Sequence, residues 1–149
     1  MIEQDLYIKK IGWKVRIYYA VSTYYADEII TDFIKIGVSG DILHKLKENL
    51  WAGKIDSGFT YSNLKNKETV MIIGLASSGA EYANSIDHEK LHLIQHILEA
   101  IDIDPKGEEI CYISGELARD MHKVTSVLIC QDCLRRLKKQ MNRKIYMRL

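Results

Sequence analysis

Residues 78–100 read SGAEYANSIDHEKLHLIQHILEA, and this stretch holds the clearest helical pattern of the chain. Ser78 with Glu81 three residues later is typical of a capping box, in which two side chains satisfy the first backbone N–H groups of a helix. Beyond it, one stripe recurs at spacings of three and four residues, formed by Tyr82, Ile86, Glu89, Leu93, Ile97 and Ala100. The sequence therefore predicts a helix over about residues 81–100 with one inward face.

Three strands are expected to form the sheet against which this helix packs. In Ile11–Ser22, apolar residues alternate with more polar ones, which is the period of a half-buried strand. Gly58–Ser62 and Glu68–Ser77 follow, and the second of these lacks alternation, which indicates burial on both faces. The short turn-forming segment 63–67 between them predicts an antiparallel hairpin.

Four more helices complete the predicted arrangement. Two precede the hairpin, one from Asp27 to near Gly37 and one over Asp41–Ala52. Two follow the long helix, one from Glu108 and a basic one over about 124–149. The sequence thus predicts a single α+β domain, a small and mainly antiparallel sheet packed against helices.

Composition limits the class of protein. The chain has 149 residues, 47% hydrophobic and 28% charged, with a formal net charge of +1, as expected of a soluble globular domain. Its longest uncharged apolar run, Val70–Ser78, is too short to cross a membrane, and its polar first residues do not resemble a secretory signal. The three cysteines are too few for a disulfide framework. We therefore expect a cytoplasmic protein with no membrane partner and no charge selecting nucleic acid.

The long helix contains His88-Glu89-Lys90-Leu91-His92, which has the pattern H-E-x-x-H. Two histidines four residues apart lie on one helix face, about 6 Å apart along the axis. Their rings can converge on one zinc ion at bond lengths of about 2.0–2.1 Å. A carboxylate beside a metal-bound water can accept its proton, and this is the chemistry that the pattern serves in metallopeptidases.

The position of Glu89 strengthens this interpretation. Glu89 falls within the apolar stripe, between Ile86 and Leu93, where a surface helix would place an aliphatic residue. Burying an unpartnered carboxylate is costly. Glu89 is therefore expected to face a cation, a metal or a cavity.

A catalytic zinc site needs a third protein ligand and one open position. The acidic candidates after the helix are Glu108, Glu109 and Glu116. His96 lies about 12 Å along the axis from the first histidine, too far to share its ion in a regular helix. We expect His96 to support the site, and Tyr112 is a second candidate for stabilising an oxyanion.

H-E-x-x-H followed by a glutamate that opens the next helix resembles the gluzincin branch of the zincin metallopeptidases. The resemblance covers about residues 69–117, and it extends to the small zincin-like proteins of phages and mobile elements. In gluzincins the glutamate often stands in an E-x-x-A pattern followed by Asp or Asn. Glu108 matches the glutamate and Cys111 the small residue, whereas Tyr112 departs from the pattern.

This resemblance implies that His88, His92 and Glu108 bind Zn2+ and that Glu89 is the general base. The sequence does not fix the path of the chain after the helix, which leaves Glu109 and then Glu116 as alternative third ligands. The resemblance also implies a peptide or protein substrate that adds as a strand to an exposed sheet edge. Two other functions remain open. One is a catalytically inactive zincin-like module that binds or stabilises, and the other is a nucleic-acid adaptor acting through the basic C-terminus. Cys130 and Cys133 form one isolated C-x-x-C and are expected to be helix residues.

Overall fold

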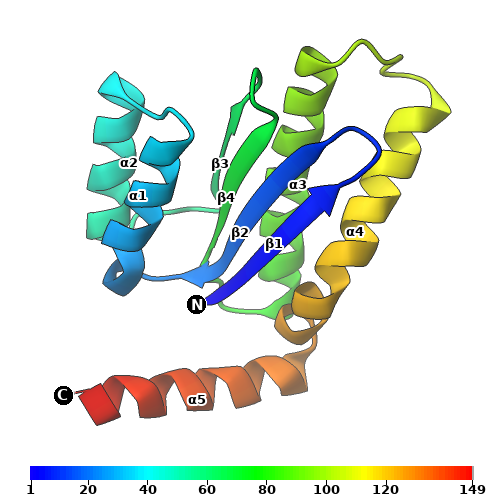
Figure 1. Ribbon diagram of the computed structural model, residues 1–149. Coiled ribbons are helices and arrows are strands. Elements are labelled where there is room, and N and C mark those ends of the chain that lie inside the picture. The colour runs from blue at the N-terminus through cyan, green and yellow to red at the C-terminus, as the bar shows by residue number, and fades with distance from the viewer. Residues whose placement is uncertain (149) are drawn as a thin grey trace.

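The computed structural model describes the backbone of residues 1–148 and the side chains of residues 1–144. It is an α+β fold in which a four-stranded sheet has helices on both faces (Figure 1). The strand order is β1-β2-β4-β3, with β1 Ile2–Ile8, β2 Trp13–Val21, β3 Gly58–Asn63 and β4 Glu68–Gly74. β1 pairs with β2 and β3 with β4 in antiparallel fashion, and β2 pairs with β4 in parallel. The predicted small, mainly antiparallel sheet is therefore confirmed.

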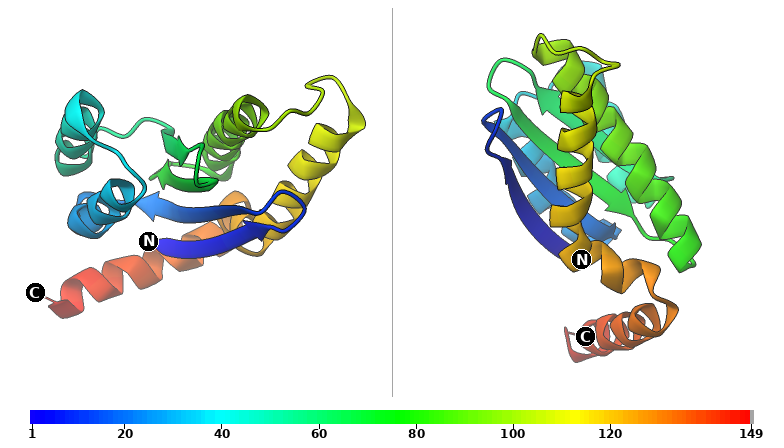
Figure 2. Two further views of the ribbon diagram at one scale, coloured as in Figure 1. Left: turned by 45° about the horizontal axis from the view of Figure 1, so that its top comes forward. Right: turned by 90° about the vertical axis from the view of Figure 1, so that its right-hand side faces the viewer.

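The helices divide between the two faces of the sheet. α1 (Ala26–Lys35) and α2 (Gly40–Ala52) lie on one side in Figure 1, and α3 (Gly79–Ala100) and α4 (Glu108–Ile129) lie on the other. A short 3-10 turn, Thr23–Tyr25, precedes α1. α5 (Gln131–Arg148) follows α4 and runs beneath the end of the sheet at which β1 begins (Figure 1 and Figure 2), with Leu134 buried in the core.

Each face of the sheet has its own hydrophobic core. Because side chains alternate along a strand, β4 sends Met71 and Ile73 to the core under α3 and α4, and Val70 and Ile72 to the core under α1 and α2. β4 is buried over Thr69–Gly74. This confirms the two-sided burial expected from its unbroken apolar run.

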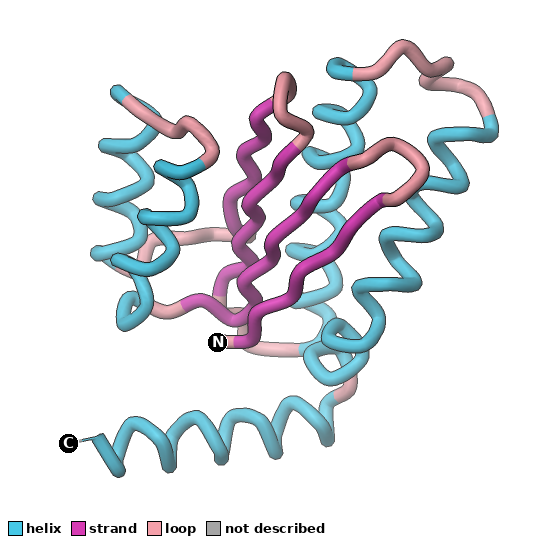
Figure 3. The backbone as a smooth tube through the Cα atoms, in the orientation of Figure 1, coloured by secondary structure: helices cyan, strands magenta, loops and turns pink. Residues whose placement is uncertain are grey.

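β3 and α3 run in the same direction along the sheet. Both hairpin turns, residues 9–12 and 64–67, lie at the same end of the sheet (Figure 3). β3 and α3 both run toward that end, so residues that follow one another along β3 meet residues in the same order along α3. This alignment positions the site described below.

The start of α3 is fixed by its cap and by contact with α4. Ser78 Oγ accepts a hydrogen bond of 3.2 Å from the backbone N–H of Glu81, which confirms the Ser78 half of the predicted capping box. A Cβ atom at Gly79 would lie 2.1 Å from the carbonyl oxygen of Ile129. The first turn of α3 can therefore pack against the end of α4 only because residue 79 has no side chain.

The first strand is an element that the sequence patterns did not reveal. Ile2, Leu6 and Ile8 turn inward along β1, but the inward position between them holds Gln4 and breaks the apolar alternation. The Gln4 amide accepts a hydrogen bond from Tyr19 Oη at 2.7 Å and donates one to the Asp120 carbonyl at 2.8 Å. Gln4 thus fills an inward position of β1 at which the alternating pattern predicts an aliphatic residue.

The boundary between the last two helices was predicted too early. α4 continues through residue 124 because Met121, Thr125 and Leu128 extend its buried face, and the chain breaks at Cys130, whose backbone is extended. Cys133 lies in α5 as expected, whereas Cys130 is the exposed junction residue and not helical. The strand predicted to end at residue 77 ends at residue 74. None of the described helices has the length and apolar character needed to cross a bilayer.

Candidate functional site

The polar face of α3 lies along the edge strand β3. Hydroxyl groups from the chain entering β3 and from the strand itself point toward α3 and bond its side chains. Ser57 and Thr60 contact Glu89, and Ser62, two residues further along β3, contacts His96, two turns further along α3. The sheet edge and the helix thus form one continuous polar seam.

Glu89 is buried and held by two hydroxyl groups. The residue is 1% exposed. Ser57 Oγ donates to Glu89 Oε1 at 2.9 Å, and Thr60 Oγ1 donates to Glu89 Oε2 at 2.7 Å. Both carboxylate oxygens therefore have a fixed position, and the predicted burial of Glu89 is confirmed.

Close packing of backbone brings β3 to Glu89. A Cβ atom at Gly58 would lie 1.9 Å from the carbonyl oxygen of Ile72 and 3.0 Å from Glu89 Cγ. Gly58 also has φ of +155°, a conformation that residues with side chains rarely adopt. A glycine at residue 58 is therefore required for the start of β3 to approach the glutamate.

His88 and His92 lie next to this carboxylate, with their Nε2 atoms 3.2 Å apart. Two nitrogens bound to one tetrahedral zinc ion at about 2.0–2.1 Å stand about 3.3 Å from each other. His88 Nε2 is 3.9 Å from Glu89 Oε1, and the His88 side chain is 55% exposed. The 3.2 Å contact is a hydrogen bond between the two imidazole rings, and its length is also close to the spacing of two nitrogens on one zinc ion.

These side chains line a cavity of about 590 Å³ at the β3 edge of the sheet. One wall is formed by α3, with His88, Glu89, His92 and His96, and the opposite wall by α2, with Ile42, Lys45, Leu46 and Asn49. The loop before β3 and the strand itself form the floor, and the acidic residues among the described lining are Asp56 and Glu89. The cavity therefore combines an apolar and basic wall with a wall of imidazoles.

His96 belongs to the same wall but has a different environment. Its Nδ1 atom lies 2.7 Å from Ser62 Oγ, and its ring centroid is 6.5 Å from that of His92. Burial lowers the pKa of His96, and the charge of His92 lowers it further. His96 therefore lines the same cavity as His88 and His92 but is held by Ser62 of β3.

The structure does not bring the acidic candidates of α4 to the two histidines. Glu108 is the exposed first residue of α4, and Glu109 lies 3.7 Å from Lys10 in the turn between β1 and β2. Glu116 lines a separate hollow beside β1, and Tyr112 is 63% exposed. Within residues 1–144, no three His, Cys, Asp or Glu side chains are grouped so that they could hold a metal ion.

The packing of α4 explains this separation. Ile86, Ile94 and Ile97 of α3 share a buried cluster with Ile113 and Leu117 of α4. With about 3.6 residues per turn, those positions lie on the opposite side of the buried glutamate from the two histidines. α4 therefore covers the flank of α3 that faces away from the cavity.

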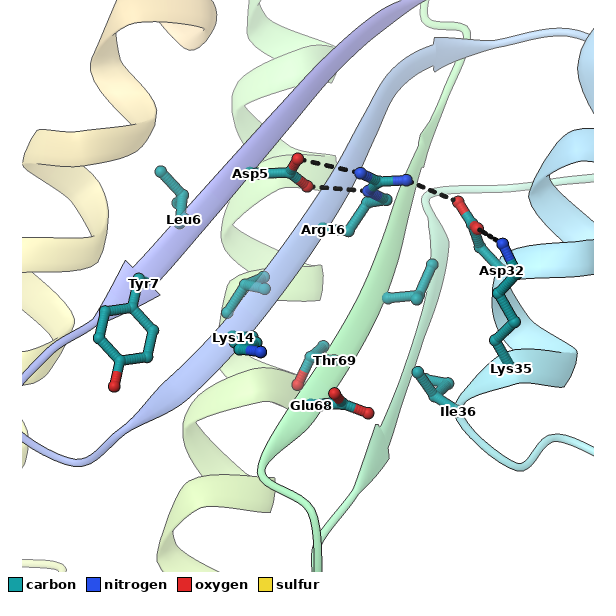
Figure 4. Close-up of a pocket in the computed structure, with 12 residues that line it drawn as sticks. Asp5, Leu6, Tyr7, Lys14, Arg16, Asp32, Lys35, Ile36, Glu68 and Thr69 are labelled. Atoms are coloured by element: carbon teal, nitrogen blue, oxygen red, sulfur yellow. Dashed lines mark hydrogen bonds and ion pairs between the residues drawn. The ribbon is translucent and has the colours of Figure 1, made fainter.

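A second hollow, of about 650 Å³, lies on the other face of the sheet, between β1, β2 and α1 (Figure 4). Four of its charged groups, Asp5, Arg16, Asp32 and Lys35, are paired with one another. Arg16 Nε donates to Asp5 at 2.8 Å and Arg16 Nη1 to Asp32 at 3.2 Å, while Tyr18 Oη also donates to Asp32. These pairs join β1, β2 and α1, and we interpret this hollow as part of the framework.

Sequence reasoning did not identify the hydroxyl groups that hold Glu89 and His96. One signal was present, because Thr60 and Ser62 alternate with Phe59 and Tyr61 along the strand. That alternation places both hydroxyls on the face toward α3. Ser57 precedes the strand and had no comparable signal.

Comparison with known proteins identifies no relative of this chain. The chain matches no family model, no curated protein and no solved structure.

Proposed function

We propose that the chain is a zinc-dependent peptide hydrolase whose active site is the cavity between α2, β3 and α3. The observation that carries this proposal is the convergence of His88 and His92, with their Nε2 atoms 3.2 Å apart, beside a buried carboxylate. That spacing suits two ligands of one tetrahedral ion. Imidazole nitrogen is also a donor that zinc prefers.

In this proposal His88 and His92 hold the metal and Glu89 handles the proton. Zinc, when bound, makes a water molecule acidic enough to lose a proton near neutral pH. Glu89 accepts that proton and returns it to the leaving amine, which is general base and then general acid catalysis. The hydroxyls of Ser57 and Thr60 keep both carboxylate oxygens in place.

The edge of the sheet supplies a place for the substrate. β3 is an outer strand of the sheet, and its residues line the cavity beside the histidines. An extended peptide can pair with such an edge by main-chain hydrogen bonds, which fix its register. A peptide bound in this way passes along α3, close to the proposed catalytic group.

The test compares the wild-type protein with Glu89→Gln, both supplied with zinc, using dye-labelled casein as substrate. Gln keeps the shape of the side chain and one acceptor oxygen but cannot accept a proton. We expect equal zinc content and a fall in hydrolysis of at least about 100-fold, in the range for loss of a general base. Casein hydrolysis that is equal in both proteins contradicts the proposal.

The two alternative functions give different results in the same preparation. A structural metal site predicts a large fall in melting temperature with chelator and no hydrolysis. A nucleic-acid adaptor predicts binding that weakens steeply with salt and survives the loss of both His88 and His92. Zinc binding together with hydrolysis that depends on Glu89 separates the proposed function from both alternatives.

A further inference from the structure

A chain of hydrogen bonds connects the buried indole of Trp13 to the wall of the cavity. Trp13 Nε1 donates to Thr69 Oγ1 at 2.8 Å, and Thr69 Oγ1 lies 2.7 Å from Ser62 Oγ. Ser62 Oγ in turn lies 2.7 Å from His96 Nδ1. The chain crosses β2, β4 and β3 in their order in the sheet and ends on α3.

The direction of each bond in this chain follows from the chemistry of the groups. An indole N–H is a donor only, so the Thr69 hydroxyl must accept from Trp13. Thr69 is 2% exposed, and Trp13 and Ser62 are its side-chain hydrogen-bond partners in the described part of the chain. If Ser62 donated to Thr69, the Thr69 proton would be buried without an acceptor, which is strongly unfavourable. Thr69 therefore donates to Ser62.

The same reasoning fixes the proton on His96. A hydroxyl has one proton, and since Ser62 accepts from Thr69, the side-chain acceptor that the described residues offer the Ser62 proton is His96 Nδ1 at 2.7 Å. We therefore infer that Ser62 donates to His96. A neutral imidazole that accepts at Nδ1 carries its proton on Nε2. The nitrogen left for a molecule in the cavity is then an N–H donor.

We propose that Trp13, Thr69 and Ser62 hold His96 in the Nε2–H tautomer, and that this N–H donates a hydrogen bond to the carbonyl oxygen of a peptide bound in the cavity. The second part rests on the proposed function. The first part is a property of the free protein.

This donor suits the chemistry of peptide hydrolysis. The carbonyl oxygen gains negative charge as the tetrahedral intermediate forms, and a donor already aimed at it stabilises that charge without reorganisation. His96 lines the cavity with Glu89 and the two converging histidines, one helical turn beyond His92. It is therefore placed to contact the substrate next to the proposed metal position.

The tautomer can be observed directly. In the metal-free full-length protein, nitrogen-detected NMR of the histidine rings distinguishes a protonated from an unprotonated Nδ1, and His96→Gln assigns the signals. We expect wild-type His96 to carry its proton on Nε2. Ser62→Ala and Thr69→Val should produce a mixture of tautomers, while Ser62→Thr and Thr69→Ser, which keep the hydroxyl, should not. The signals of His44 and His122 serve as internal references.

Two results would overturn the tautomer assignment. One is a proton on Nδ1 in the wild type, and the other is an unchanged His96 signal in folded Ser62→Ala and Thr69→Val. Because these spectra need neither metal nor substrate, they are readable whether or not the protein hydrolyses peptides. Failure of the proposed function is thereby separated from failure of this inference.

The donor role is tested by the kinetics of zinc-loaded variants on dye-labelled casein. His96→Ala should lower kcat by about 100-fold or more, as expected for loss of one oxyanion donor. His96→Gln, which retains an N–H, should recover part of the loss, and His122→Ala on the exposed face of α4 should match the wild type. Unchanged kcat in His96→Ala would overturn the donor role, as would equal losses in His96→Ala and His96→Gln.

Discussion

The Nε2 atoms of His88 and His92 lie 3.2 Å apart on the flank of α3 that faces the cavity. We predict that this pair binds one zinc ion per chain and that His88→Ala or His92→Ala weakens zinc binding by at least about 100-fold, since each removes one of few protein ligands. Competition with a chromogenic chelator at constant pH measures the affinity.

The matched control for zinc binding is His122→Ala, because His122 is exposed on α4 and does not line the cavity. It should bind zinc as the wild type does. Wild-type affinity in both cavity variants would show that zinc binds elsewhere on the chain.

A second prediction concerns a third protein ligand for the proposed zinc ion. The acidic residues among the described lining of the cavity are Asp56 and Glu89, and Glu89 is held by hydroxyl groups. Exposed Asp56 lies in the loop before β3 and lines the same cavity, but among the described residues it is not grouped with the two histidines. If this loop moves to the ion when zinc binds, Asp56→Asn lowers zinc affinity by at least about tenfold, because a carboxylate is a zinc ligand and an amide is a poor one.

The glutamates of α4 provide the comparison for Asp56. With α4 packed on the other flank of α3, Glu109→Gln and Glu116→Gln should leave zinc affinity unchanged. Glu108→Gln tests the ligand implied by the gluzincin resemblance. A loss of affinity in Glu108→Gln and none in Asp56→Asn would mean that α4 approaches the histidines when the metal binds.

A third prediction tests the approach of β3 to Glu89. Gly58→Ala should lower the free energy of unfolding by about 1–3 kcal/mol, the usual effect of overpacking, because its Cβ would collide with the Ile72 carbonyl. Gly115→Ala is the control, since nothing lies near that position on the exposed face of α4. It should raise the free energy of unfolding by about 0.5–1 kcal/mol through helix propensity. Urea unfolding measures both, and equal effects of the two changes would contradict the packing described here.

A fourth prediction concerns acid and the ion pair of Asp5 with Arg16. Hydrogen bonds from Arg16 lower the pKa of Asp5 below its ordinary value. A carboxyl whose pKa is lower in the folded state stabilises the protein above the unfolded pKa of about 3.9, and the stabilisation is lost as the pH falls through the folded pKa. The difference in unfolding free energy between wild type and Asp5→Asn should therefore shrink as the pH is lowered from 6 to 2. Glu3→Gln, on the same strand and outside the ion pairs of the described residues, is the matched control for the loss of one carboxylate.

The sequence was sufficient to predict the helix that carries the site. The Ser78 cap and the inward stripe predicted α3 to within two residues at its start, and Glu89 within that stripe predicted a buried carboxylate. Both features are local, since they depend on spacing within one helix. The β3–β4 hairpin was also predicted from a local feature, the short turn-forming segment that connects the two strands.

Features that depend on distant contacts could not be predicted in this way. Gln4 occupies an inward position of β1 because Tyr19 and the Asp120 carbonyl of α4 offer it partners, and a single-strand pattern does not contain those partners. The break at Cys130 has no glycine or proline to mark it. α4 packs on the flank of α3 that faces away from the histidines. Which flank α4 covers is decided by how the helices pack in the folded core, and the pattern of a single helix does not contain this information.

The most direct test of the central claim is a crystal structure of the protein grown with zinc, with anomalous diffraction recorded on both sides of the zinc absorption edge. The account predicts one strong peak within bonding distance, about 2.0–2.1 Å, of both His88 Nε2 and His92 Nε2, on the cavity side of α3. Zinc peaks found only at other positions, with these two rings unbound, would contradict it.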